Sequence, residues 1–162
     1  MTDFKVAIIM GSRSDLEAMQ EAANVLQEFG VEYEMRALSA HRTPAAVQEF
    51  IGGLADRGFA AVIAGAGGAA HLAGVCASHT HLPVIGVPMR TSLAGGLDSL
   101  LSTVQMPRGI PVATTATGGT GAYNAALLAV SMIALSDPQM REKYIAFRAS
   151  QTQKVLDQSV ID

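Results

Sequence analysis

Short apolar runs alternate with amphipathic segments along the whole chain, and this alternation limits the fold more than any other feature. Apolar runs occupy residues 4–10, 59–64 and 84–87, and a shorter one lies at 112–115. Runs that are apolar on both faces are typical of strands in a parallel sheet, because helices cover both faces of that kind of sheet. The alternation of apolar and polar residues at 31–37 predicts one more strand.

Between these runs, apolar residues recur three and four positions apart, as they do on one face of a helix. The stripes are Leu16, Met19, Ala23 and Leu26; Val47, Phe50, Ile51 and Leu54; and Leu97, Leu100, Leu101 and Val104. Gly30 and Gly58 stand where the first two helices should stop. Further helices are predicted at about 68–78 and 121–135. Asp137 and Pro138 supply an N-cap and a first-turn proline for a terminal helix.

The sequence therefore predicts an α/β fold in which residues 1–162 form a single domain. We expect a parallel sheet with helices on both faces, in a flavodoxin- or Rossmann-like three-layer arrangement, plus a C-terminal helix at 138–157. Ligands of such sheets bind beyond the carboxyl ends of the strands. The candidate site therefore lies in the loops that follow residues 10, 37, 64, 87 and 115.

The composition narrows the possible partners. Only 15% of the residues are charged, against about 25% in an average domain, so we expect copies of the chain to cover part of its surface. A net charge of -3, no Trp and no basic run argue against a nucleic-acid partner.

No apolar run approaches the roughly 20 residues that span a bilayer, and no leader pattern is present, so we expect a cytoplasmic protein. The lone Cys76 excludes an intramolecular disulfide and fits a reducing compartment.

The first loop reads GSRSD and admits two interpretations. Ser14 and Glu17 have the spacing of a capping box, which would only start the helix. Alternatively, Gly11, the Ser12 hydroxyl and the helix amides form an anion site, with Asp15 accepting hydrogen bonds from sugar hydroxyls.

The second loop, LSAHRTP, places three chemically active side chains together. Thr43 as N-cap and Pro44 at the first helical position explain only the end of the motif. Arg42 suits a phosphate through its fork of donors, and Ser39 can donate to the same group. His41 can give and take a proton near neutral pH, which predicts a catalytic role.

The third loop, GAGGAAHL, matches the G-x-G-x-x-A pattern of dinucleotide sites. It does not follow the first strand, and no acidic residue stands about 20 positions later, so a close backbone approach to a ligand is the better interpretation. Further along, Cys76, His79 and His81 have spacings that a metal site uses, but no second ligand pair follows them. A glycine-rich helix start near residue 118 suits either a phosphate or close helix packing.

Taken together, several motifs resemble one enzyme family. The motifs MGSRSD, SAHRTP, AGAGGAAHL, PVIGVP, GLDSLLSTVQMPRGIPVAT and NAALLA occur in the order found in bacterial-type (class I) N5-carboxyaminoimidazole ribonucleotide mutases. These enzymes are also described as the catalytic subunit of phosphoribosylaminoimidazole carboxylase. The resemblance covers residues 6–135 and implies an isomerase of purine (IMP) biosynthesis. Enzymes of this kind move a carboxyl group from the exocyclic amine of an aminoimidazole to the adjacent ring carbon.

The resemblance also implies roles for individual residues. It makes His41 the general acid and base, and for the reaction we expect transient release and recapture of carbon dioxide. The substrate-binding residues that it implies are Ser12, Asp15 and Arg42, and Ser39 and His71 match positions that line the family's site. We expect Ser14 and Gly67 to bind the substrate as well. The resemblance further implies that no metal or organic cofactor is needed, and that the chain forms a homo-octamer with active sites shared between subunits. In such an octamer the helix at 138–157 would pack between subunits.

Two departures and two competing functions accompany the resemblance. The family usually has Trp where this chain has Leu16, and Pro where it has Ala73. A nicotinamide-dependent oxidoreductase remains an alternative, although its ribose-reading acid is absent. A non-catalytic receiver-like module shares the fold class, but it should carry an Asp at the end of the third strand, where this chain has AGAGG.

Overall fold

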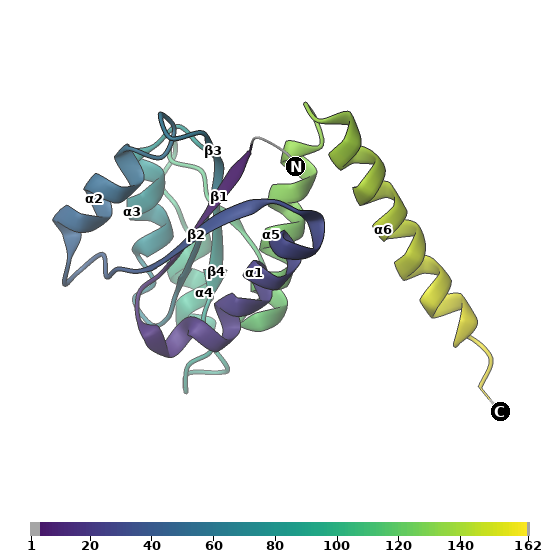
Figure 1. Ribbon diagram of the computed structural model, residues 1–162. Helices are drawn as coiled ribbons and strands as arrows, with labels where there is room; N and C mark the ends of the chain where they lie inside the picture. The colour runs from purple at the N-terminus through teal and green to yellow at the C-terminus, as the bar shows by residue number, and fades with distance from the viewer. Residues whose placement is uncertain (1–3, 162) are drawn as a thin grey trace.

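The computed structural model describes residues 4–161 and contains a five-stranded sheet (Figure 1). The sheet has the order β2-β1-β3-β4-β5, and all four neighbouring pairs in it are parallel. The strands are β1 (Lys5–Met10), β2 (Glu32–Ala37), β3 (Phe59–Ala66), β4 (Val84–Pro88) and β5 (Ala113–Thr114). The predicted parallel α/β sheet is thus confirmed.

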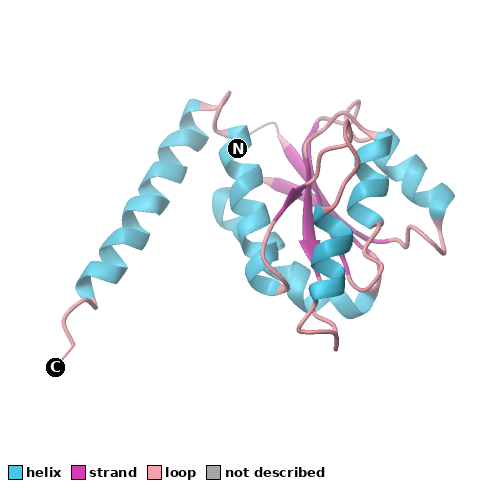
Figure 2. Cartoon of the chain, turned by 180° about the vertical axis from the view of Figure 1, so that it is seen from behind, coloured by secondary structure: helices cyan, strands magenta, loops and turns pink. Residues whose placement is uncertain are grey.

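Helices cover both faces of this sheet (Figure 2). They are α1 (Leu16–Phe29), α2 (Pro44–Gly52), α3 (Leu72–His79), α4 (Leu97–Val104), α5 (Gly119–Ile133) and α6 (Pro138–Asp157), with a short 3₁₀ turn η1 (Arg13–Asp15) before α1. Helices α1 and α5 lie on one face, and α2 and α3 lie on the other, so the sheet is the middle of three layers.

The period of two in each strand divides the core between the two faces. On β1, Val6 and Ile8 face the layer of α1 and α5, whereas Ala7 and Ile9 face the layer of α2 and α3. All four side chains are fully buried, which explains why this strand is apolar at every position after Lys5.

Helix α1 ends as the sequence predicts but begins differently. Gly30 adopts a left-handed conformation with φ 73° and donates its N–H to the carbonyls of the last turn. Of the two interpretations of this loop, the capping box is wrong, because Ser14 lies within η1, and it is the Ser12 hydroxyl that accepts the Ser14 N–H. Leu16 is 39% exposed, so the buried stripe of α1 begins only at Met19.

Helix α3 is shorter than expected. A helix from about residue 68 was predicted, but α3 begins at Leu72. Gly68 has φ 69°, which is outside the helical region, and residues 67–71 form tight turns instead. His71, which directly precedes α3, therefore lies at the carboxyl edge of the sheet together with the loop that follows β3.

Helix α4 turns its apolar stripe away from the core. Leu97, Leu101 and Val104 are 44%, 48% and 49% exposed, whereas the polar residues Ser99 and Thr103 are buried. These three residues therefore stand outside both core clusters of residues 4–161. An apolar face of this size on a charge-poor protein is typical of an interface with another molecule.

Helix α6 is attached at its beginning and stands away from the rest of the molecule along its later turns (Figure 1). The Asp137 carboxylate caps the Met140 N–H, and the Met140 side chain is buried. Tyr144 and Phe147 then contact the ring of Phe29 at the end of α1. None of the helices in the described part of the chain combines the length and apolar character that a membrane span needs.

Candidate active site

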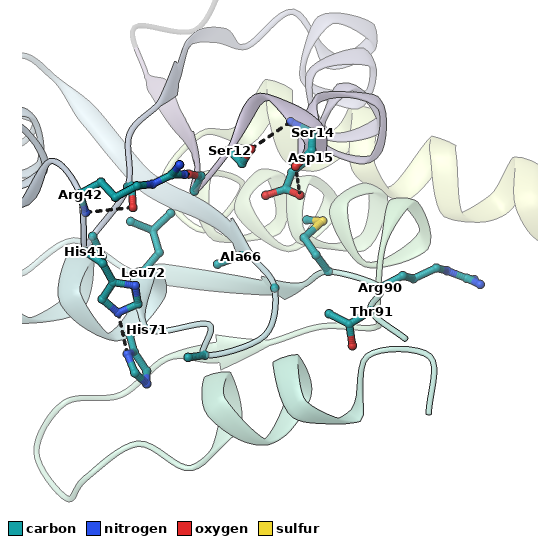
Figure 3. Close-up of a pocket in the computed structure, with 16 residues that line it drawn as sticks. Ser12, Ser14, Asp15, His41, Arg42, Ala66, His71, Leu72, Arg90 and Thr91 are labelled. Atoms are coloured by element: carbon teal, nitrogen blue, oxygen red, sulfur yellow. Dashed lines mark hydrogen bonds between the residues drawn. The ribbon is translucent and has the colours of Figure 1, made fainter. Parts of the chain in front are cut away.

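A cavity of about 540 Å³ opens at the carboxyl ends of β1 to β4 (Figure 3). Such an edge is where ligands of parallel sheets bind. The cavity brings together the predicted catalytic residue His41 and all seven predicted substrate-binding residues. Its lining consists of Gly11, Ser12, Ser14, Asp15, Ser39, Ala40, His41, Arg42, Ala66, Gly67, Ala69, His71, Leu72, Met89, Arg90 and Thr91.

The loop after β1 presents two hydroxyls and a carboxylate. The Ser12 hydroxyl accepts the Ser14 N–H at 3.3 Å, and the Ser14 hydroxyl donates to Asp15 Oδ1 at 3.3 Å. Burial raises the pKa of the Asp15 carboxyl above its usual 3.8, although the bond from Ser14 works in the opposite direction. A half-buried carboxylate with few internal donors is suited to accept hydrogen bonds from a ligand's hydroxyl groups.

The loop after β2 is held in shape by its own side chains. Ser39 Oγ accepts the Arg42 N–H at 3.2 Å, and the Thr43 hydroxyl both accepts the Ser39 N–H and donates to the Ser39 carbonyl. Thr43 thus stands at the N-cap position of α2 but makes no side-chain cap there, which corrects its predicted role. Its hydroxyl closes the loop that carries His41 instead.

Arg42 connects this loop with the loop after β1. Its guanidinium donates to the Gly11 carbonyl at 3.3 Å, across 31 residues of sequence. The side chain is exposed and reaches along the cavity toward Ser12 (Figure 3). Arg42 and the hydroxyl of Ser12 therefore form one positively charged end of the cavity.

His41 and His71 form a pair that the sequence analysis did not predict. His41 Nε2 lies 2.8 Å from His71 Nδ1, and the two rings meet edge to face with an interplanar angle of 88°. The residues follow different strands, β2 and β3, and are 30 positions apart. The hydrogen bond fixes the orientation of the His41 ring, while the other ring nitrogen of His41 lies away from His71 (Figure 3).

The loop after β4 adds three residues that the sequence analysis missed: Met89, Arg90 and Thr91. Their position in the sequence could have identified them, because they directly follow a buried strand and so lie at the carboxyl edge of the sheet. Arg90 points away from the two histidines (Figure 3) and lies against the backbone at Gly118. Thr91 donates to Asp98 at the start of α4.

Small residues of the GAGGAAHL loop, for which a close backbone approach to a ligand was predicted, form one side of the cavity. Gly67 and Ala69 line it, and together with Gly68 between them they make up the cavity wall (residues 67–69). Gly65 and Ala70 are buried away from it. A Cβ at position 65 would lie 2.5 Å from Met19 Sδ, so the absence of a side chain there serves core packing.

The residues considered for a metal lie elsewhere. Cys76 is fully buried, and burial raises the pKa of its thiol to about 12. His79 is half-buried at the end of α3, and His81 is exposed beyond it. Within residues 4–161, no three His, Cys, Asp or Glu side chains converge in a way that would hold a metal ion.

Comparisons with known proteins agree with the geometry of this site. The sequence model of the AIR carboxylase family matches residues 5–154. The chain is 51% identical to an N5-carboxyaminoimidazole ribonucleotide mutase of Pseudomonas aeruginosa, over 94% of this chain and 93% of that protein. It is 56% identical to the mutase of the same name from Pyrococcus abyssi, over 89% of this chain and 82% of that protein.

A solved structure shares the fold over nearly the whole chain. The crystal structure of Treponema denticola PurE superposes with a TM-score of 0.85 and 30% sequence identity, and 95% of each chain is covered.

Proposed function

Because the chain belongs to the AIR carboxylase family, we propose that the cavity at the carboxyl edge of its sheet is the active site of an N5-carboxyaminoimidazole ribonucleotide mutase. The enzyme interconverts N5-carboxyaminoimidazole ribonucleotide and 4-carboxy-5-aminoimidazole ribonucleotide in purine biosynthesis. The observation that carries the site assignment is the pairing of His41 with His71 in the same cavity as Arg42 and Asp15. Neither an oxidoreductase nor a receiver module accounts for this arrangement or for the relatives' names.

The charged groups divide the cavity into a binding end and a reacting end. Arg42 and the hydroxyls of Ser12 and Ser39 bind the phosphate of the substrate, because a guanidinium fork and hydroxyl donors suit phosphate oxygens. The Asp15 carboxylate accepts hydrogen bonds from the ribose hydroxyls. The aminoimidazole then extends toward His41 and the cavity wall, where the small residues permit close approach.

His41 takes part in two proton transfers during the reaction: it donates one proton and later accepts another. As the bond between the exocyclic nitrogen and the carboxyl carbon breaks, carbon dioxide leaves and His41 donates a proton to that nitrogen. The ring carbon then attacks carbon dioxide, a carbon–carbon bond forms, and His41 removes the proton from the same ring carbon. The imidazole ends the cycle in the protonation state in which it began.

His71 supports His41 in this cycle. Its Nδ1 atom, 2.8 Å from His41 Nε2, holds the ring in one orientation while the other nitrogen of His41 serves the substrate. A ring held by one hydrogen bond keeps its reacting nitrogen in place between the two proton transfers.

The direct test of the function is an assay on the purified protein, with the unstable N-carboxylated substrate generated in the cuvette. We expect conversion to the 4-carboxy product at a rate proportional to the enzyme concentration. Absence of conversion in a folded sample, shown to be folded by circular dichroism, would contradict the proposal.

We further propose that the chain is a cytoplasmic homo-octamer with active sites shared between subunits. Two surfaces support an assembly: the exposed apolar stripe on α4, and the later turns of α6, where Ile145, Val155 and Leu156 are exposed. In the octamer, α6 packs between subunits. Light scattering should give eight times the chain mass of 16.8 kDa, and a monomer mass at micromolar concentration would refute the assembly.

A further inference from the structure

Two serines of α4 hold the cavity wall from behind. Ser99 is completely buried, and its Oγ accepts the Gly68 N–H at 3.0 Å. The Ser102 hydroxyl lies 3.1 Å from the Gly68 carbonyl oxygen and also donates within the helix to the Asp98 carbonyl at 2.7 Å. Helix α4 therefore bonds the N–H of the central wall residue through Ser99, and it places a hydroxyl that is shared with the Asp98 carbonyl beside the carbonyl of the same residue.

The wall depends on this support because its central residue, Gly68, has no side chain to anchor it. Gly68 has φ 69°, and a Cβ placed there would meet nothing within 4 Å, so packing does not hold this residue. Gly67 and Ala69, on either side of it, line the cavity. Hydrogen bonds therefore fix the backbone at Gly68, and loss of the acceptor would leave a part-buried N–H without its bond to Ser99, at a cost in free energy.

The beginning of α4 is itself fixed to the cavity edge. The Asp98 carboxylate accepts hydrogen bonds from the Thr91 hydroxyl at 2.5 Å and from the Ser99 N–H at 2.9 Å. Thr91 lines the cavity, so α4 connects the loop after β4 with the wall after β3. This connection explains why the Ser99 hydroxyl is fully buried although the apolar residues of the same helix face outward.

We propose that Ser99 and Ser102 are positioning residues of the mutase, which hold the cavity wall in place against the ligand so that carbon dioxide stays beside the ring carbon until it is recaptured. This inference rests on the proposed function, in which the carbon–nitrogen bond breaks before the carbon–carbon bond forms. Between the two events, carbon dioxide is attacked by the ring carbon or escapes past residues 67–69. A loosened wall raises the fraction that escapes, whereas the phosphate end at Arg42 is unchanged.

The experiment measures escape directly, through exchange of labelled carbon dioxide into the stable product. Unlabelled 4-carboxy-5-aminoimidazole ribonucleotide is incubated with enzyme and labelled bicarbonate, and label in the product is divided by the number of turnovers. For Ser99→Ala we expect at least a fivefold rise in exchange per turnover, with unchanged affinity for aminoimidazole ribonucleotide. A structural defect alone would lower the turnover without changing this ratio.

Thr103→Val is the matched control. Thr103 is also a buried polar residue of α4, but its hydroxyl donates to the Ser99 carbonyl within the helix and makes no contact with the wall. This variant should lose stability while its exchange per turnover stays at the wild-type value. An equal rise in both variants would overturn the proposal, because helix stability rather than the wall contact would then set the escape.

Ser102→Ala keeps the proposal testable if Ser99→Ala does not fold, because Ser102 is only half-buried. It should raise the exchange ratio by a smaller factor than Ser99→Ala, and wild-type exchange in a folded Ser102→Ala protein would then refute the proposal. If the wild-type enzyme itself exchanges at every turnover, the proposed reaction fails. If the wild type and Ser99→Ala both exclude label equally, only the role of the serines fails.

Discussion

Replacement of Arg42 by Ala tests the phosphate end of the site in a quantitative way. Within residues 4–161, the guanidinium makes one hydrogen bond, to the Gly11 carbonyl at 3.3 Å, which leaves further donors for a ligand. A hydrogen bond to a charged group contributes about 1.5–3 kcal/mol. Loss of the phosphate contact should therefore weaken the binding of aminoimidazole ribonucleotide by about 2–3 kcal/mol, which is roughly 30- to 160-fold.

The assay is calorimetric titration of the wild type, Arg42→Ala and Arg42→Lys with two ligands, the ribonucleotide and its dephosphorylated riboside. Arg42→Lys keeps the charge but loses the fork of donors, so it should fall between the other two proteins for the ribonucleotide. The riboside should bind all three proteins equally. Equal losses for both ligands would refute the phosphate contact, because they would mean that Arg42 acts only by joining its loop to Gly11.

The other predictions concern catalysis, stability and assembly. His41→Asn should abolish turnover while aminoimidazole ribonucleotide still binds, and near-normal turnover would remove His41 from the mechanism. Because burial raises the pKa of Asp15, its ionisation costs stability as the pH rises through the folded value. Asp15→Asn should thus raise the melting temperature at neutral pH and weaken substrate binding. The difference in stability between Asp15→Asn and the wild type should shrink as the pH falls towards 3.8, and a constant difference would refute burial of the charge as its cause. Gly65→Ala should lower the urea-unfolding free energy by about 1–3 kcal/mol, since its Cβ would lie 2.5 Å from Met19 Sδ, and an unchanged value would contradict the packing argument. Leu101→Glu, on the exposed stripe of α4, should lower the mass seen by light scattering; an unchanged mass would place the subunit contact elsewhere.

The layers of the fold could be predicted because local periodicity encodes them. A strand that is buried on both faces is apolar at every position, and Ala7 and Ile9 on one face complement Val6 and Ile8 on the other. The end of α1 could also be predicted from a local signal, because it depends on a single residue, Gly30, that tolerates positive φ.

The orientation of α4 could not be predicted, because a stripe of apolar residues does not say what it contacts. The pattern of Leu97, Leu101 and Val104 predicted a helix with one apolar face, and the structure shows that the side chains buried against the sheet are instead those of Ser99 and Thr103. The spacing of Ser14 and Glu17 was misleading for a similar reason, since Ser12 satisfies the Ser14 N–H instead.

The residues of the site could be named from the loops, but their contacts could not. Ser12, Asp15, His41 and Arg42 were found because each follows a predicted strand at the carboxyl edge. The bond between His41 and His71 joins residues 30 positions apart, and only the tertiary arrangement of β2 and β3 brings them to 2.8 Å.

The most direct measurement of the central claim follows the carboxyl carbon itself. N5-carboxyaminoimidazole ribonucleotide labelled in its carboxyl group is mixed with excess wild-type enzyme in unlabelled bicarbonate and stopped after one turnover. Recapture within the site predicts that most of the label appears in the 4-carboxy product, because the ring carbon attacks carbon dioxide before it leaves. Near-complete loss of label would mean that carbon dioxide exchanges with solvent, and it would contradict transfer of the carboxyl group within the site.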